Sequence, residues 1–154
     1  MQISDFITEG RVLPDMRSAT KQEALHELGH LVGQGAAPTE DIVRVLEERE
    51  RLASTGIGEE IAIPHGKVDG VDDLVVGLGR SQHGVEFESV DGRPTRLFFV
   101  LVAPRESTGV HLQALARISR LCKEPGFRER LLQAPGRREM YDILCGEDAK
   151  FRAR

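Results

Sequence analysis

The sequence predicts an α/β fold, a single layered domain in which a mixed β-sheet is flanked by helices. Two helical patterns precede the strand-like segments, one of which is a continuous apolar run, and a long helical pattern follows them. Helices before, after and around three or four strands are typical of layered α/β domains. The chain of 154 residues is long enough for one domain that buries roughly two thirds of its unfolded surface. The expected helices span 20–34, 39–53 and 108–123, and the expected strands span 60–64, 74–81 and 96–103.

The helix boundaries are predicted from capping residues and from proline. Thr20 is the expected N-cap of the first helix, and Glu23 three residues later completes a capping-box pattern. Thr108 is the expected cap of the third helix. Pro125 and Pro135 mark the starts of two further helices, because proline is tolerated in a first helical turn. The domain is expected to span 1–146, followed by a polar C-terminal tail, 147–154, that is frayed or loosely packed.

The strand at 96–103 contains the run LFFVLVA, which indicates a central strand covered on both faces. A short edge strand is expected at 85–87, and the DGRP turn at 91–94 separates it from the central strand. The sheet is therefore expected to contain three or four strands.

Composition excludes several classes of protein. The net charge is −4, basic residues are scattered among acidic ones, and tryptophan is absent, so we expect no nucleic-acid binding. The longest apolar run, 97–103, is too short to span a bilayer, and no secretory signal is apparent. Cys122 and Cys145 have no metal-like spacing and are too few for a disulfide framework. We expect a soluble cytoplasmic protein with reduced thiols, no cofactor and no membrane insertion.

The segment TGIGEEIAIPHGK at 55–67 places one histidine, His65, between Pro64 and Gly66. Proline fixes its own φ and cannot donate a ladder hydrogen bond, so the strand is expected to finish there. Gly66 then permits a conformation or a close approach that a side chain would block. His65 is therefore predicted to be held at a strand end in a compact turn, a placement that suits a reactive histidine.

The other histidines fall into two groups. His26 and His30 have the i, i+4 spacing of a helical metal site, but they lie opposite the apolar stripe and no ligand pattern accompanies them, so we expect no metal. His83 is expected to be a solvated turn residue. His111 continues the buried stripe of its helix, together with Leu115, Ile118 and Cys122. Taken alone, the residue favours a core histidine hydrogen-bonded to the backbone over a functional one.

Arg49 lies within the inward stripe of the second helix, with Ile42, Leu46 and Ala53. Arginine is almost never buried unless it is paired, and an anion in a pocket is a natural partner. The alternative is that its stem lies along the apolar face and carries the guanidinium to water. If His65, His111 and Arg49 converge, they form a small anion pocket, and the helix N-terminus near His111 favours phosphate. A neutral histidine is nucleophilic, so such a pocket suits phosphoryl transfer.

These residues resemble a known family. RERLASTGIGEEIAIPHGK at 49–67, followed by LFFVLVAP and GVHLQALARISRL downstream, is similar to enzyme IIA of the bacterial phosphotransferase system, of the fructose/mannitol and nitrogen-regulatory type. The resemblance covers roughly 3–144 and implies that family's fold.

The resemblance implies a phosphocarrier. His65 matches the phosphorylated histidine, which accepts the phosphoryl group on Nε2 from the histidine-containing phosphocarrier protein. His111 matches a second histidine that neutralises the phosphoryl group, and Arg49 matches the arginine beside the site. Glu59 falls where some members carry a glutamate that orients the arginine or the histidine. Glu60 departs from the small residue of many members, and its carboxylate would repel a phosphohistidine unless it points to the far face of the strand.

Within the family, TGIG and IPHGK are more similar to the nitrogen-regulatory members, and we expect a free-standing chain without an attached sugar-permease domain. We therefore expect a regulatory phosphoprotein that binds protein targets according to its phosphorylation state. One alternative is a component of a fructose/mannitol-type uptake system that passes the phosphoryl group to a separate IIB subunit. The others are a binding-only regulator with a vestigial site and a histidine-ligated metalloenzyme, the latter weakened by the absence of ligand spacing.

Overall fold

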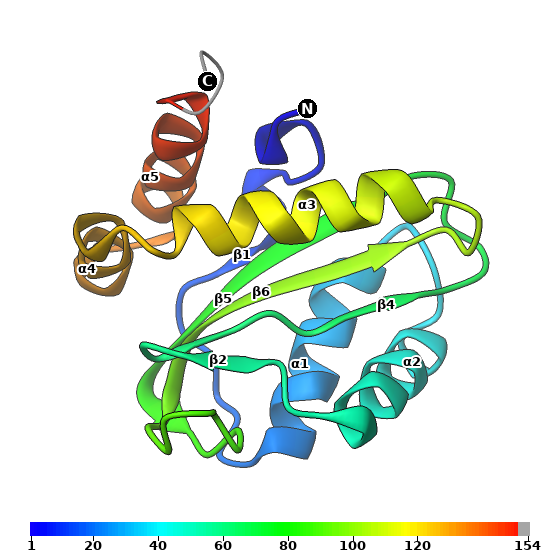
Figure 1. The fold of residues 1–154 in the computed structure, drawn as a ribbon, viewed down its shortest axis with the longest axis horizontal. Coiled ribbons are helices and arrows are strands. Elements are labelled where there is room, and N and C mark those ends of the chain that lie inside the picture. The colour runs from blue at the N-terminus through cyan, green and yellow to red at the C-terminus, as the bar shows by residue number, and fades with distance from the viewer. Residues whose placement is uncertain (151–154) are drawn as a thin grey trace.

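A computed structural model describes residues 1–150, in which one mixed sheet separates two groups of helices (Figure 1). Helix α3 crosses one face of the sheet, helices α1 and α2 cover the other, and α4 and α5 lie at one end (Figure 1). The predicted α/β layering is thereby confirmed. The helices are α1 (Lys21–Gly33), α2 (Thr39–Leu52), α3 (Thr108–Leu121), α4 (Pro125–Gln133) and α5 (Arg137–Lys150), with short 3-10 turns η1 (Ile3–Asp5) and η2 (Glu9–Arg11).

The sheet has six strands in the order β1-β5-β6-β3-β2, and β4 pairs with β6 beyond the end of β3. Its two long strands, β5 and β6, pair antiparallel, whereas β3 and β4 run parallel to β6. The strands are β1 (Val12–Leu13), β2 (Gly56–Gly58), β3 (Ile61–Ala62), β4 (His65–Lys67), β5 (Val75–Val85) and β6 (Thr95–Ala103).

Strand β6 is the centre of the hydrophobic core, as its continuous apolar run predicted. Phe99 and Leu101 belong to the cluster that includes Ile118 of α3. Phe98 and Val100, one residue out of step, belong to the opposite cluster with the residues of α1 and α2. Because successive side chains of a strand point to opposite faces, a strand buried on both sides must be apolar throughout.

The predicted capping box of α1 is present. The Oγ1 atom of Thr20 accepts a hydrogen bond from the backbone N–H of Glu23 at 3.2 Å, and the Glu23 carboxylate accepts one from the Thr20 N–H at 3.1 Å. Two donors that the helix cannot satisfy internally are thereby paired. At the start of α3 the N-cap position is Ser107, one residue before the expected cap.

Three predictions near the ends of strands and helices differ from the structure. No separate edge strand forms at 85–87, because β5 continues to Val85 through an irregularity at which Gly84 has a φ of +84°. His83 consequently lies in the exposed end of β5 rather than in a turn. Helix α5 begins at Arg137, two residues beyond Pro135.

The polar residues after Gly146 are not frayed as far as the structure describes them. Helix α5 continues to Lys150, where buried Asp148 pairs with Arg117 of α3 at 2.5 Å and Glu147 pairs with Arg130 of α4 at 2.6 Å. These ion pairs hold a polar helix end against two other helices. The rest of the expected tail, 151–154, lies outside the described residues.

Within residues 1–150, no helix combines the length and the apolarity that a membrane crossing requires.

Candidate active site

The histidine between proline and glycine begins a strand rather than following one. Strands β3 and β4 keep the same register against β6, with Ile61 opposite Leu97 and His65 opposite Leu101. Between them Pro64 has no N–H to donate, but its carbonyl accepts a hydrogen bond from Leu101 at 3.0 Å. The expectation that the strand finishes at Pro64 is therefore only half right. The N–H of Leu101 on the parallel strand β6 bonds to the Pro64 carbonyl, and pairing with β6 resumes at His65.

The ring of His65 is fixed in one orientation and one tautomer. Its Nδ1 atom lies 2.8 Å from the carbonyl oxygen of Ile63. Because a carbonyl oxygen can only accept, Nδ1 must carry the proton of this bond. In the neutral ring the lone pair then resides on Nε2, which is the nitrogen left to act as a nucleophile.

Gly66 brings the His65 strand close to helix α2. A Cβ atom at this position would lie 3.0 Å from Cγ2 of Val45 and 3.3 Å from its Cβ. Both distances are shorter than ordinary van der Waals contact, so only glycine allows β4 to pack here without displacement. The close approach predicted for Gly66 is thus confirmed.

His111 meets His65 across the sheet edge. It lies in the first turn of α3, is only 6% exposed, and its ring centroid is 5.3 Å from that of His65, with the ring planes inclined by 54°. Ile118 and Cys122 of the same stripe are buried, which confirms the predicted inward face. Among the described residues, its Nδ1 atom is buried without a hydrogen-bond partner, so the backbone bond of a satisfied core histidine is not formed at this nitrogen.

Both rings are held in the neutral form. Burial lowers the pKa of His65; the positive charge of Arg49 acts in the same direction, while the bond to Ile63 and the negative charge of Glu50 oppose it. Burial also lowers the pKa of His111 to about 4, and the positive charge of Lys67 and repulsion from His65 whenever that ring is protonated act in the same direction. A neutral pair of imidazoles at physiological pH provides one nucleophile and one hydrogen-bonding partner for an anion.

Arg49 lies where the inward stripe of α2 meets solvent. Ile42 and Leu46 are fully buried, Arg49 is half-buried, and Ala53 is exposed. The guanidinium donates from Nη1 to the carbonyl of Ala53 at 2.9 Å, and its charge is close enough to lower the pKa of His65. The charge of Arg49 therefore acts on His65, as the hypothesis of a shared pocket requires, while the guanidinium itself is bonded to a carbonyl at the exposed end of α2.

Residues 5–146 match the family model described as phosphoenolpyruvate-dependent sugar phosphotransferase system, EIIA 2. The chain belongs to this EIIA 2 family.

Relatives of both the regulatory and the sugar-specific kind are similar to this EIIA 2 chain. A nitrogen regulatory protein of Bradyrhizobium diazoefficiens is 34% identical over 94% of the chain and 95% of its own length. A fructose-specific EIIA component of Haloferax volcanii is 37% identical over 82% of the chain and 84% of its own length.

Solved structures of both the regulatory and the sugar-specific kind are also similar to this chain. The crystal structure of the nitrogen regulatory protein IIA-Ntr from Neisseria meningitidis matches with a TM-score of 0.87 and 31% identity, covering 92% of this chain and 98% of that one. The Escherichia coli complex of enzyme IIAMTL and phosphorylated enzyme IIBMTL matches with a TM-score of 0.77 and 26% identity, covering 92% and 99%. The fold predicted from the family resemblance is thereby confirmed.

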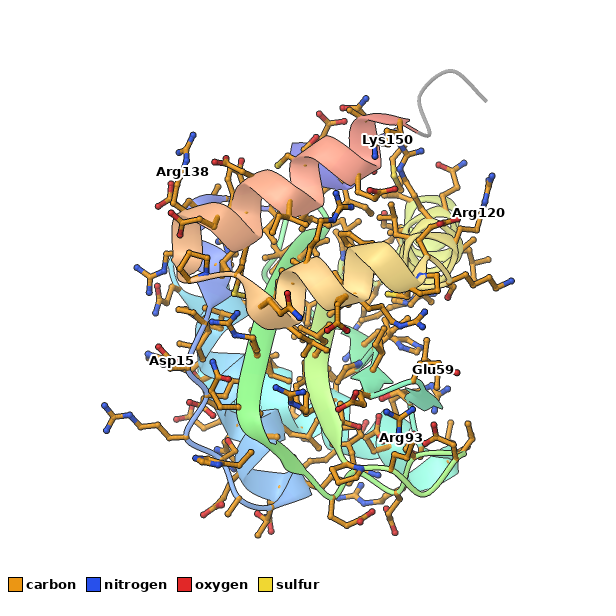
Figure 2. The ribbon with its side chains drawn as sticks, turned by 90° about the vertical axis from the view of Figure 1, so that its left-hand side faces the viewer. Asp15, Glu59, Arg93, Arg120, Arg138 and Lys150 are labelled. Atoms are coloured by element: carbon orange, nitrogen blue, oxygen red, sulfur yellow. The ribbon has the colours of Figure 1, made fainter. Side chains whose placement is uncertain are left out.

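The glutamate expected to orient the EIIA 2 site faces elsewhere. Glu59 and Glu60 adopt left-handed φ angles of 57° and 67° in the turn between β2 and β3. Among the described residues, the exposed carboxylate of Glu59 pairs with Arg93 at 3.8 Å and Arg128 at 3.4 Å, rather than with Arg49 or His65. Figure 2 shows Glu59 and Arg93 near each other at one edge of the molecule. Glu60 pairs with Arg93 and Arg96, so its charge is compensated away from the histidines.

The carboxylate that does reach the neighbourhood of His65 belongs to Glu50, which the sequence reasoning missed. Glu50 is 9% exposed, pairs with Lys21 at 2.9 Å, and its negative charge raises the pKa of His65. It follows Arg49 on α2, so a search of both neighbours of the inward arginine would have found it. The exposed His26 and His30 on α1 do not join the site, and residues 1–150 contain no group of three or more potential metal ligands.

Proposed function

We propose that this EIIA 2 chain is a phosphocarrier that accepts a phosphoryl group on Nε2 of His65. The observation that carries the proposal is the pairing of two neutral histidines whose ring centroids lie 5.3 Å apart, one of them held with its proton on Nδ1 and its lone pair on Nε2. The donor is the histidine-containing phosphocarrier protein that the family resemblance implies.

The transfer needs little covalent chemistry from the protein. The lone pair on Nε2 of His65 forms the new N–P bond as the N–P bond of the donor phosphohistidine breaks, and the donor imidazole leaves with that electron pair. Nδ1 of His65 keeps its proton throughout, so the Ile63 carbonyl stabilises the positive charge that the ring gains. Positioning and charge neutralisation supply most of the catalysis in phosphoryl transfer.

His111 and Arg49 neutralise the phosphoryl group without being modified themselves. A neutral His111 can donate one hydrogen bond to a phosphoryl oxygen. The low pKa of its ring keeps it uncharged, so it acts as a neutral hydrogen-bond donor. Arg49 supplies a permanent positive charge with a forked donor geometry that suits phosphate. The first turn of α3, which carries His111, adds backbone N–H groups and a positive dipole end.

The relatives support a regulatory use of the phosphoryl group as the main proposal. The structure of a nitrogen regulatory protein matches with a TM-score of 0.87, against 0.77 for the mannitol enzyme. In this role the chain binds protein targets according to the phosphorylation state of His65. The alternative is transfer to a separate IIB subunit. It is favoured by the 37% identity to a fructose-specific EIIA component and by the similarity to a mannitol enzyme IIA that forms a complex with its phosphorylated IIB.

The test is phosphorylation of the chain by phosphoenolpyruvate and the purified general carrier proteins, followed by mapping of the modified residue. We expect one acid-labile phosphoryl group on His65, its loss in His65→Ala, and its retention in His83→Ala, whose histidine is exposed at the end of β5. Uptake by His65→Ala would refute the proposal. A wild-type chain that binds a partner but never takes up phosphate would instead identify a binding-only regulator.

Transfer from the phosphorylated chain then separates the two uses. Release of the phosphoryl group to a purified IIB subunit, at a rate comparable to uptake, identifies a sugar-system component. Capture of a protein target by only one of the two forms, with no transfer to IIB, identifies a regulator.

A further inference from the structure

Glu50 is buried at the end of α2 and holds the segment that follows it. Its carboxylate accepts hydrogen bonds from the backbone N–H of Thr55, at 3.1 and 3.3 Å, and from the Thr55 hydroxyl. The Lys21 ammonium lies 2.9 Å from the same carboxylate and also pairs with Glu88. A buried carboxylate with a cationic partner and two donors is well compensated, which makes it a firm anchor for Thr55.

The bonds of Thr55 continue toward the nucleophile. The carbonyl of Thr55 accepts a hydrogen bond from the N–H of Ile63 at 3.0 Å, extending the antiparallel β2–β3 ladder by one position. The carbonyl of Ile63 in turn accepts the bond from Nδ1 of His65 at 2.8 Å. An uninterrupted series of hydrogen bonds therefore joins Glu50 to the ring whose other nitrogen is proposed to react.

The Ile63 carbonyl decides which nitrogen of His65 is nucleophilic. A free neutral imidazole exchanges between two tautomers, and only the one with the proton on Nδ1 leaves a lone pair on Nε2. If this carbonyl moved out of the ring plane, its hydrogen bond to Nδ1 would weaken and would no longer select this tautomer and this ring orientation. The position of Ile63 is set by its own N–H bond to Thr55, which Glu50 fixes.

We propose that Glu50, acting through Thr55 and Ile63, is the positioning residue that sets the tautomer and orientation of His65. It touches neither the ring nor the phosphoryl group. This inference rests on the proposed function, since it concerns the reactivity of the same histidine. Glu50 then has the orienting task that the family resemblance implies for Glu59.

The experiment compares Glu50→Ala with Glu50→Gln in the full chain, with Glu48→Ala as the matched control on the exposed face of the same helix. The first substitution removes the acceptor for Thr55, whereas the second keeps an acceptor oxygen of the same reach. The ring nitrogen chemical shifts of isotope-labelled His65 report its tautomer directly. The rate of phosphoryl uptake from the general carrier protein reports the consequence for transfer.

We expect Glu50→Ala to give a substantial Nε2–H population and to slow uptake on the order of ten- to a hundredfold, the effect of a misplaced reacting group. Glu50→Gln restores both readouts in part, and Glu48→Ala leaves them as in wild type. If Glu50→Ala does not fold, Thr55→Val and Thr55→Ser replace it. Only the serine variant keeps a hydroxyl that can donate a hydrogen bond to the Glu50 carboxylate. In that pair the valine variant alone shifts the tautomer.

The proposal is overturned if these variants keep the wild-type tautomer and uptake rate and lose only melting temperature. Glu50 would then be a structural anchor. The chemical-shift measurement needs no donor protein. A wild-type chain that failed to accept phosphate would therefore refute the proposed function, while the effect of Glu50 on the His65 tautomer could still be measured.

Discussion

The imidazole rings of His65 and His111 lie with their centroids 5.3 Å apart, although one ring belongs to strand β4 and the other to the first turn of helix α3. The two elements meet because β4 pairs with the C-terminal part of β6, the strand that leads directly into α3. Sheet register therefore determines the distance between the two histidines. A shift of either element would separate the rings that the proposed transfer requires.

Arg49→Ala is expected to slow phosphoryl uptake by on the order of a hundredfold, because it removes a preorganised charge beside the transferring group. Arg49→Lys should recover part of the rate, since it restores the charge without the forked geometry. Single-turnover uptake and thermal melting measure the two effects separately. Arg44→Ala, an exposed change on the same helix, is the control. A variant that mainly unfolds would show that Arg49 is structural.

The stability contributed by neutral His111 is expected to be lost in acid. The pKa of this ring is about 4 in the folded chain and near 6.5 when unfolded, so between these values the unfolded chain binds a proton that the folded chain does not. The free energy of unfolding then falls as pH is lowered, by at most about 1.4 kcal/mol per pH unit for this group.

Urea unfolding of wild type and His111→Gln across this pH window tests the sign. The advantage of wild type over the variant should shrink steadily as pH falls from about 6.5 toward 4, and then level off. Unfolding free energies that stay parallel for the two proteins would show that His111 titrates normally.

Gly66→Ala is expected to cost about 1–3 kcal/mol of stability, the usual penalty for overpacking. The added methyl would lie 3.0 Å from Cγ2 of Val45 and push β4 away from α2. Because β4 carries His65, uptake should slow together with the loss of stability. Gly126→Ala is the matched control, since a methyl there meets open space. Equal behaviour of the two variants would mean that Val45 yields without cost.

Glu59→Gln is expected to leave phosphoryl uptake close to wild type and to change the free energy of unfolding by less than about 1 kcal/mol. Its carboxylate is exposed and pairs with Arg93 and Arg128, and exposed ion pairs contribute little. Parallel uptake assays of Glu59→Gln and Glu50→Ala compare the two candidate orienting carboxylates. A strong loss in Glu59→Gln would show that this side chain leaves its arginines to reach the site during transfer.

Local sequence patterns predicted the features that depend on neighbours within a few residues. Thr20 and Glu23 predicted the start of α1, the run at 97–103 predicted a strand buried on both faces, and the IPHG segment predicted a rigidly held histidine. The inward face of α3 followed from spacing alone, because a helix repeats every 3.6 residues. The family resemblance supplied the chemical task expected of these residues.

Which of these residues come into contact depends on how the strands and helices pack in three dimensions. The parallel register of β4 on β6 brings His111 to His65, and the turn at Glu59 directs that carboxylate to Arg93. The bonds from Glu50 to Ile63 cross between a helix end and two strands. Such contacts join elements distant in the chain, and their geometry is set by sheet register and core packing, which a local sequence pattern does not encode.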